Sequence, residues 1–294
     1  MSMSVSVQKP YQLTQSQKMM VFILSMSLYG LSNMFTELIP SIQLGFIELS
    51  VEYFAFIPLT LCILFHPFYA AVGASLGEII FGELMLGQFG GIGEVEKFIT
   101  FSLGMFIAGI LVRNPLNRKQ VTIAVMAGLL VYHLLGAIVD IGKVWIGVDE
   151  FEAVSGLAES IVIVEGVALL NDLLFSGILF ALLPTLYLVP RLYGKIEPLL
   201  GMKPRNNKVH YSLGQIITPK LVVIVVVLAS IAILSEFLSE TEWAFGEWEP
   251  EFLETIGNWF IWVPISLAAL VTIVVLVVIR SRSKMNTKEL KNVG

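Results

Sequence analysis

The sequence has few charged residues, one cysteine and three histidines. Charged side chains make up 14% of the 294 residues and hydrophobic ones 56%, whereas about 25% of the residues of a soluble domain are charged. This low charge excludes an ordinary soluble globular domain. Long apolar runs separated by short polar segments indicate instead a polytopic membrane protein of the all-α class.

The scarcity of cysteine and histidine limits the chemistry open to the chain. Cys62 alone cannot form a disulfide within the chain, and the three histidines lack the spacing of a zinc site. The sequence contains no nucleophile motif and no nucleotide-binding glycine motif. We therefore expect no enzymatic activity, no cofactor and no metal. The net charge of −5 gives no basic face, so we expect no nucleic-acid partner.

We interpret the apolar segments as about eight transmembrane helices in contact with membrane lipid. The second and third segments are separated only by the neighbourhood of His66 and Pro67. We expect a tight hairpin there, because a proline disfavours helical geometry in the residue before it. The approximate bounds of the eight segments are 19–36, 52–66, 68–84, 98–113, 120–140, 158–189, 220–237 and 258–280.

The distribution of lysine and arginine predicts the orientation in the membrane. Basic residues gather near the N-terminus, at 113–119, at 191–208 and in the C-terminal tail, whereas 148–159 and 239–254 are acidic. Short basic loops stay on the cytoplasmic side. A cytoplasmic N-terminus followed by eight spans places every basic segment inside and both acidic loops outside. This predicts a multi-pass protein of the cell membrane with both termini in the cytoplasm.

The same pattern divides the chain into three parts. We expect a six-helix membrane core with an outward-facing pocket at 1–195, a basic cytoplasmic linker at 196–218, and a two-helix hairpin at 219–294. The hairpin has an acidic outer loop and a basic tail, and its apolar helices are typical of lipid-facing spans. We expect it to have a structural or docking role.

The connections after the first, third and fifth spans carry most of the acidic residues of the core. With the aromatic residues beside them, they predict an outward-open pocket for a small-molecule substrate. The alternative is a plain water-exposed rim, which the positive-inside rule alone would produce. The candidate substrate-binding residues are Glu37, Glu48, Tyr53, Glu78, Glu83, Glu94, His133, Asp140, Trp145 and Asp172.

Several ionisable residues lie at membrane depth, where each costs about 2.5–3.5 kcal/mol at a helix centre. These residues are Glu78, His133, Glu165 and Asp172. Either a functional role or a role as polar contacts between helices would explain their position. His133 precedes Asp140 by seven residues, so the two can share one helix face.

The stretch around Glu78 raises a separate question. Glu78 and Glu83 are five residues apart, about 140° on an α-helix, and are not expected to share a narrow face. Gly73 and Gly77 on the same segment predict the close approach of a neighbouring helix. We expect Glu83 at the mouth of the pocket and Glu78 deeper, with His133 as its first candidate partner. Asp172 is the other carboxylate that His133 could contact.

Residues 19 to about 190 resemble the substrate-binding S components of energy-coupling-factor (ECF) transporters. The resemblance rests on a first helix, the extended segment IPSIQLGFIELSVEYFAFIP, and the hairpin LCILFHPFYAAVGASLGEIIFGE. Many S components have a Gly-Pro turn followed by small residues and an acidic or amide residue. Here the turn is His66-Pro67, followed by an AxxGAxxGE-type helix.

The resemblance implies a six-helix core that captures a vitamin-like or cationic micronutrient from outside. Such a subunit docks on a membrane-embedded ECF coupling subunit, and separate ATPases energise release inside. The family's first helix carries alanines at four-residue spacing for this docking. In this chain the corresponding small residues are Ser25, Ser27, Gly30 and Ser32, in a looser array.

Two other functions are compatible with the residues. One is a stand-alone, proton-coupled secondary transporter, with Glu78, His133 or Asp172 as a proton relay. The other is a non-transport membrane protein of assembly or signalling, acting through the C-terminal hairpin and its acidic loop.

Overall fold

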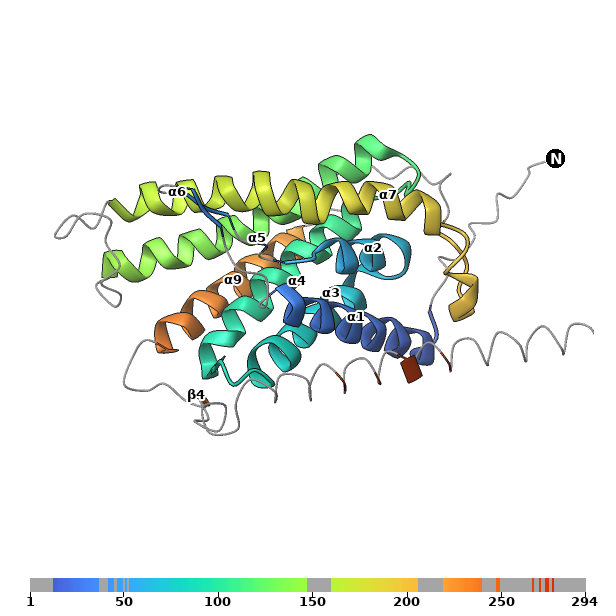
Figure 1. Cartoon of the computed structure of the whole chain (residues 1–294), viewed down its shortest axis with the longest axis horizontal. Coiled ribbons are helices and arrows are strands. Elements are labelled where there is room, and N and C mark those ends of the chain that lie inside the picture. The colour runs from blue at the N-terminus through green and yellow to red at the C-terminus, as the bar shows by residue number, and fades with distance from the viewer. Residues whose placement is uncertain are drawn as a thin grey trace, which may run out of the picture.

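A computed structural model describes residues 13–36, 42–44, 47–49, 51, 53–146, 160–205, 219–239 and 247–248, and the single positions 266, 270, 273, 274 and 277. These residues are mostly helical (Figure 1). The α-helices are α1 (Gln15–Thr36), α2 (Phe56–Leu64), α3 (Pro67–Gly77), α4 (Glu94–Leu111), α5 (Arg118–Ile146), α6 (Ile161–Asn171), α7 (Leu183–Leu192) and α9 (Pro219–Ser239).

Short helices of other types connect or extend these elements. Two π-helices, η1 (Glu78–Leu84) and η4 (Asp172–Leu182), continue α3 and α6, and two 3₁₀-helices are η2 (Gly91–Gly93) and η5 (Pro198–Leu200). The described strands form two small antiparallel pairs: β1 (Ile42–Leu44) with β2 (Ile47–Leu49), and β3 (Phe89–Gly90) with β4 (Glu247–Trp248).

Among the described residues, four helices are long and apolar enough to cross a membrane, which confirms the all-α membrane class. They are Gln15–Thr36, Arg118–Trp145, Ile161–Leu192 and Val222–Ser239. In Figure 1 the third of these, which joins α6, η4 and α7, extends along one edge of the molecule. The last expected span, 258–280, lies almost wholly outside the described residues.

The expected count of eight spans is not reproduced among the described residues. Helix α2 has nine residues, about 14 Å of helix, where a bilayer core requires about 30 Å. Helix α4 is longer, but Glu94 and Glu96 occupy its first turn and Lys97 follows. Apolar runs and the positive-inside pattern had predicted these spans, and neither reports the length of the helix that forms on each side of a break.

The break predicted at His66 and Pro67 is confirmed. His66 has extended backbone angles and Pro67 begins α3, where its missing N–H would have no partner in the helix. Helices α2 and α3 pack against each other and against α4. This short helical hairpin lies in the main hydrophobic core, with Cys62 fully buried in it.

Helices α1 and α3 meet along a small-residue seam, formed by Ser25 and Gly30 of α1 and by Ala70, Gly73 and Gly77 of α3. A side chain at Gly73 or Gly77 would overlap a backbone carbonyl of α1, that of Phe22 or Met26. The hydroxyl of Ser25 donates to the carbonyl of Ala70 at 2.7 Å. The close approach predicted from Gly73 and Gly77 is thus confirmed, and the neighbour is α1.

Two of the four small residues of α1 take part in this internal contact. Ser25 bonds to Ala70, and a Cβ at Gly30 would clash with Phe81 and Gly77. Part of the surface that the S-component resemblance assigns to docking on a coupling subunit therefore faces α3 and η1 in this structure, and Ser27 and Ser32 are buried.

The wide turns of η1 change the relation between Glu78 and Glu83. In this stretch the amides of Met85 and Gln88 bond to the carbonyls of Ile80 and Glu83, five residues earlier. Residues five apart are near neighbours in such a π-helix. The separation of about 140° expected for an α-helix is therefore wrong.

Helix α9 packs on α4 and α5. Ala232 of α9 is buried with Ile99 and Leu103 of α4. Near the end of α9 the carboxylate of Glu236 forms an ion pair of 3.0 Å with Lys143 of α5. The first helix of the expected hairpin thus lies against α4 and α5, and β4 adds a strand pair with β3.

The two ends of the helical body differ in charge. At the acidic end, where α4 begins, Lys97 pairs with Glu83 and Glu94, and Lys143 pairs with Asp140 and Glu236. At the basic end, the segment after α7 folds back under the helices: Gln17 donates to the carbonyl of Gly201, and Arg205 donates to those of Ile63 and Gly109.

Candidate functional site

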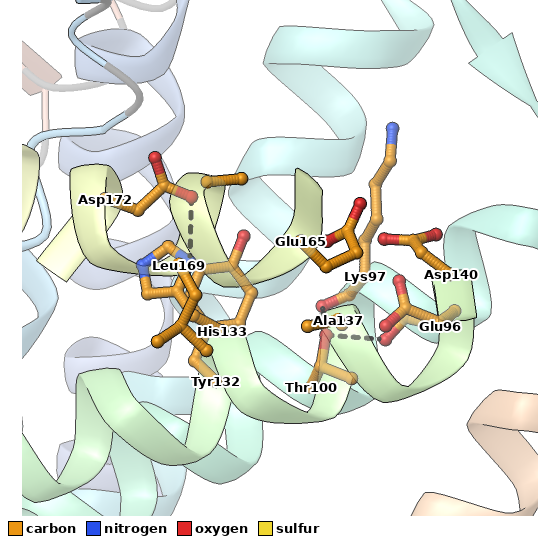
Figure 2. A pocket seen from close by; sticks show the side chains of 12 residues that line it. Glu96, Lys97, Thr100, Tyr132, His133, Ala137, Asp140, Glu165, Leu169 and Asp172 are labelled. Atoms are coloured by element: carbon orange, nitrogen blue, oxygen red, sulfur yellow. Dashed lines mark hydrogen bonds and ion pairs between the residues drawn. The ribbon is translucent and has the colours of Figure 1, made fainter. Parts of the chain in front are cut away.

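A cavity of about 210 Å³ lies between α4, α5 and the helix formed by α6 and η4. Figure 2 shows acidic side chains converging on it from all three sides. We call it the acidic cavity; its lining residues are Glu96, Lys97, Thr100, Tyr132, His133, Gly136, Ala137, Asp140, Glu165, Ala168, Leu169 and Asp172.

A group of three polar side chains forms its inner part. The hydroxyl of Tyr53 lies 2.6 Å from Nε2 of His133, and Nδ1 of His133 lies 3.5 Å from Oδ2 of Asp172. The same hydroxyl lies 3.5 Å from the carbonyl oxygen of Asp172. Both His133 and Asp172 also line the cavity, so this group, the Tyr53–His133–Asp172 network, is accessible from it.

Aromatic rings hold this network in place. The ring of Tyr132 lies 4.5 Å from that of His133 and packs edge-on against Tyr53, at 6.2 Å, and Phe101, at 5.2 Å. Tyr53 is only 3% exposed and Phe101 only 1%. Packing on several sides restricts the side-chain rotamers, so the three polar groups are pre-positioned.

The outer part of the cavity holds carboxylates from three helices. Glu96 comes from α4, Asp140 from α5 and Glu165 from α6. Asp140 is paired with Lys143 at 3.2 Å, whereas Oε1 of Glu96 is buried without a hydrogen-bond partner. A buried carboxylate oxygen without a donor is costly. This part of the cavity therefore favours a ligand that brings N–H donors or positive charge.

Lys97 lines the cavity but directs its charge away from it. Its ammonium group pairs with Glu83 at 3.1 Å and with Glu94 at 3.4 Å. Glu94 also accepts a hydrogen bond of 3.2 Å from the backbone N–H of Gly90. In Figure 2 the Lys97 side chain points away from Glu96 and Glu165. The cation among the lining residues is thus engaged outside the cavity, and the four lining carboxylates outnumber Lys97 and the Lys143 that pairs with Asp140.

The described residues contain no group of three or more His, Cys, Asp and Glu side chains arranged to hold a metal ion. The acidic groups are spread along the cavity instead. Such spacing suits an organic cation with several N–H groups, or separate sites for single protons, better than one compact ion.

The structure places the candidate binding residues in several different settings. Three of them, His133, Asp140 and Asp172, line the cavity, and Tyr53 bonds to His133. Glu83 and Glu94 hold Lys97 at the acidic end. Three candidates remain apart from these: Trp145, which is 61% exposed, Glu37, which lies outside the described residues, and Glu48, of which only the backbone in β2 is described.

The prediction that His133 is the partner of Glu78 is wrong. His133 contacts Tyr53 and Asp172 and not Glu78. Glu78 begins η1, on the side of the molecule where α3 packs against α1, whereas His133 belongs to α5. Asp172, the other carboxylate considered for His133, occupies the position beside the imidazole.

Sequence reasoning left several lining residues out of the candidate set. Glu165 had been placed at membrane depth but not in the pocket, and Glu96, Lys97, Thr100 and Tyr132 were also missed. A signal for them exists: Glu165 and Asp172 are seven residues apart, as are His133 and Asp140. Two neighbouring helices with polar residues at the same two-turn spacing indicate facing polar stripes.

Comparison with known proteins gives a family for the chain but no described relative. Searches of curated protein sequences and of solved structures gave no match. The profile of DUF8171, described as a family of unknown function, matches residues 20–288. Because this match extends over most of the sequence, the chain belongs to the DUF8171 family.

Proposed function

We propose that this membrane protein captures a small cationic solute, such as a protonated amine, in the acidic cavity and carries it across the membrane. The single observation that supports this most is the convergence of Glu96, Asp140, Glu165 and Asp172 from three helices on one cavity. Ionisable groups inside membrane proteins are costly and generally face a functional pathway. An excess of carboxylates attracts and desolvates a cation rather than an anion.

The size of the cavity narrows the class of solute. Sites for drug-sized ligands have volumes of roughly 300–1,000 Å³, whereas this one has about 210 Å³. A small amine fits this volume better than a vitamin of several rings does. The cationic alternative among the expected substrates is therefore the one we favour.

We propose that the acidic end faces the outside and the basic end the cytoplasm. The segregation of Lys97, Lys143 and their carboxylate partners from Arg205 and Lys18 supports this orientation, together with the positive-inside rule. The segment Pro67–Leu84 and helix α4 each have 18 residues, about 27 Å of helix if regular, and are the next candidates for crossing the membrane.

Uptake by purified protein in liposomes tests the proposal. We expect radiolabelled methylammonium to enter liposomes that contain the protein, and the variant Glu165→Gln to lower the initial rate by about tenfold, which corresponds to about 1.4 kcal/mol. Glu197→Gln is a matched control, because Glu197 is a buried carboxyl at the basic end and outside the cavity. Equal uptake in empty liposomes, or equal loss in both variants, would contradict the proposal.

The source of energy separates two forms of the proposal. An ECF-type capture subunit would bind methylammonium but would not accumulate it without a coupling subunit and ATPases. A stand-alone carrier would accumulate it under an ion or pH gradient. The packing of Ser25 and Gly30 of α1 against α3 favours the stand-alone form, because it occupies part of the expected docking face.

A further inference from the structure

We infer that the Tyr53–His133–Asp172 network is a proton-binding site and that the proton held there is exchanged for the solute. This inference rests on the proposed function, since it assigns the coupling ion for the same cavity. The ligand of this second site is a single proton. The solute itself is held by the carboxylates nearer the acidic end, Glu96, Asp140 and Glu165.

The distances describe the site with a neutral imidazole. The contact of 2.6 Å between the Tyr53 hydroxyl and Nε2 of His133 suits an O–H donor and a nitrogen acceptor. Nε2 then carries no hydrogen, so the hydrogen of the ring lies on Nδ1, which faces Oδ2 of Asp172 at 3.5 Å. The structure thus assigns the Nδ1–H tautomer to the neutral form.

The same atoms also accommodate the protonated imidazole. In that form Nε2–H donates to the oxygen of Tyr53, and the hydroxyl hydrogen of Tyr53 must turn to another acceptor. The carbonyl oxygen of Asp172, 3.5 Å from that hydroxyl, is in place to accept it. Nδ1–H still faces the Asp172 carboxylate, now as a charged pair. The network can therefore hold either protonation state of His133. The change requires only rotation of the Tyr53 hydroxyl hydrogen and small changes in the distances.

Asp172 offers two acceptors to the network, its carboxylate and its carbonyl oxygen, and it begins a wide helical turn. Asp172 is the first residue of η4, and a Cβ added at Gly177 would lie 3.0 Å from its carbonyl oxygen. Glycine at this position leaves the space around the carbonyl free of a side chain. π-Helical turns of this kind occur often at functional sites.

The charges around the cavity make the proton and the solute compete. Burial of His133 disfavours the imidazolium ion, nearby carboxylates offset part of that cost, and a bound cation among the same carboxylates removes the offset. We therefore expect binding of a cationic solute to release the proton. The charged and titratable groups that line the cavity around His133 are Glu96 and Lys97 of α4, Asp140 of α5, Glu165 of α6, Asp172 of η4, and Tyr132 beside it.

Nitrogen NMR on histidine-labelled protein tests the site directly. The chain has three histidines, so the ring signals are few, and His133→Gln assigns the relevant pair. We expect neutral His133 to show a protonated Nδ1 and an unprotonated Nε2, and Tyr53→Phe to remove that preference. Because the first result is obtained on the unaltered protein, it does not depend on the folding of a variant. An Nε2–H tautomer in the unaltered protein would overturn the assignment.

Addition of methylammonium at fixed pH tests the exchange. At a pH where His133 is partly protonated, we expect its imidazolium fraction to fall as methylammonium binds, with release of the corresponding fraction of a proton, and no such release from His133→Gln. His66→Gln is the matched control at the basic end. Failure of methylammonium to bind would contradict the proposed function. Binding that leaves His133 unchanged would contradict only the proton site.

Discussion

The small-residue seam and the acidic cavity are both contacts between neighbouring helices, but they are built in opposite ways. In the seam, Gly73 and Gly77 bring α3 against the backbone of α1, and Ser25 bonds to the carbonyl of Ala70. At the cavity, carboxylates of α4, α5, α6 and η4 and the imidazole of His133 line open space between the helices. The seam brings a side-chain-free face of α3 against the backbone of α1, whereas the cavity leaves open volume between side chains.

The difference separates stability from function. Without a hydrophobic driving force between helices in lipid, close packing and hydrogen bonds stabilise their association, and the seam supplies both. The cavity gives up such contacts and accepts costly polar groups in their place. We therefore expect substitutions in the seam and at the basic end to change stability, and conservative ones in the cavity to change binding alone.

The largest loss of stability is expected for Gly77→Ala. The added Cβ would overlap the carbonyl of Met26, and neither backbone can move without parting the two helices. Overpacking of this kind costs about 3 kcal/mol. Thermal unfolding in detergent, followed by tryptophan fluorescence, measures it.

Gly166→Ala is the matched control, since nothing lies within 4 Å of a Cβ at that position of α6. It should stabilise the protein by about 0.5–1 kcal/mol, because alanine is the better helix former. Equal effects of the two substitutions would show that the seam is less tightly packed than described.

Arg205→Gln is expected to cost about 2 kcal/mol. Its guanidinium donates to the carbonyls of Ile63, at 2.9 Å, and Gly109, at 3.1 Å, in the last turns of α2 and α4. Hydrogen bonds from a charged donor are worth about 1.5–3 kcal/mol, and a cation is favoured at helix C-termini. Lys203→Gln removes an exposed charge two residues away and should leave the unfolding temperature unchanged. A similar decrease in both variants would point to net charge rather than to these bonds.

A smaller effect, of opposite sign, is expected for Glu197→Gln. Glu197 is fully buried and its carboxylate oxygens lack hydrogen-bond partners. Burial raises the pKa of this carboxyl, although the nearby amides of Gly194, Ile196 and Glu197 itself oppose the shift. A raised pKa in the folded state favours folding below the pKa of the unfolded chain, and that advantage is lost as the pH rises.

We therefore expect Glu197→Gln to unfold at a temperature a few degrees higher than the unaltered protein at neutral pH. The difference should vanish below about pH 4, near the pKa of an unperturbed glutamate. Unfolding scans from pH 4 to 8 measure it. A difference that is independent of pH would mean that ionisation of Glu197 is not the cause.

The sequence predicts these regions unequally, for physical reasons. Gly73 and Gly77 predict a close contact because only small residues permit one, and the structure supplies α1 as the partner. The partner of His133 could not be chosen, since periodicity places a residue on a face but does not say which helix lies opposite. The π-turns at Glu78 and Asp172 change the phase of each helix after those residues, and regular spacing does not reveal such turns.

The smallest effect on stability is expected for Glu165→Gln, the substitution expected to reduce transport. The Glu165 side chain lines the cavity and has no hydrogen bond or ion pair among the described residues. Its amide isostere therefore loses no contact and no longer carries a charge that is costly at membrane depth. We expect the unfolding temperature to remain within about 1 °C of that of the unaltered protein. A substitution that breaks no hydrogen bond or packing contact shifts the free energy of unfolding by no more than a few tenths of a kcal/mol. A decrease as large as that of Arg205→Gln would mean that the cavity carboxylates stabilise the helices, and the contrast between seam and cavity would fail.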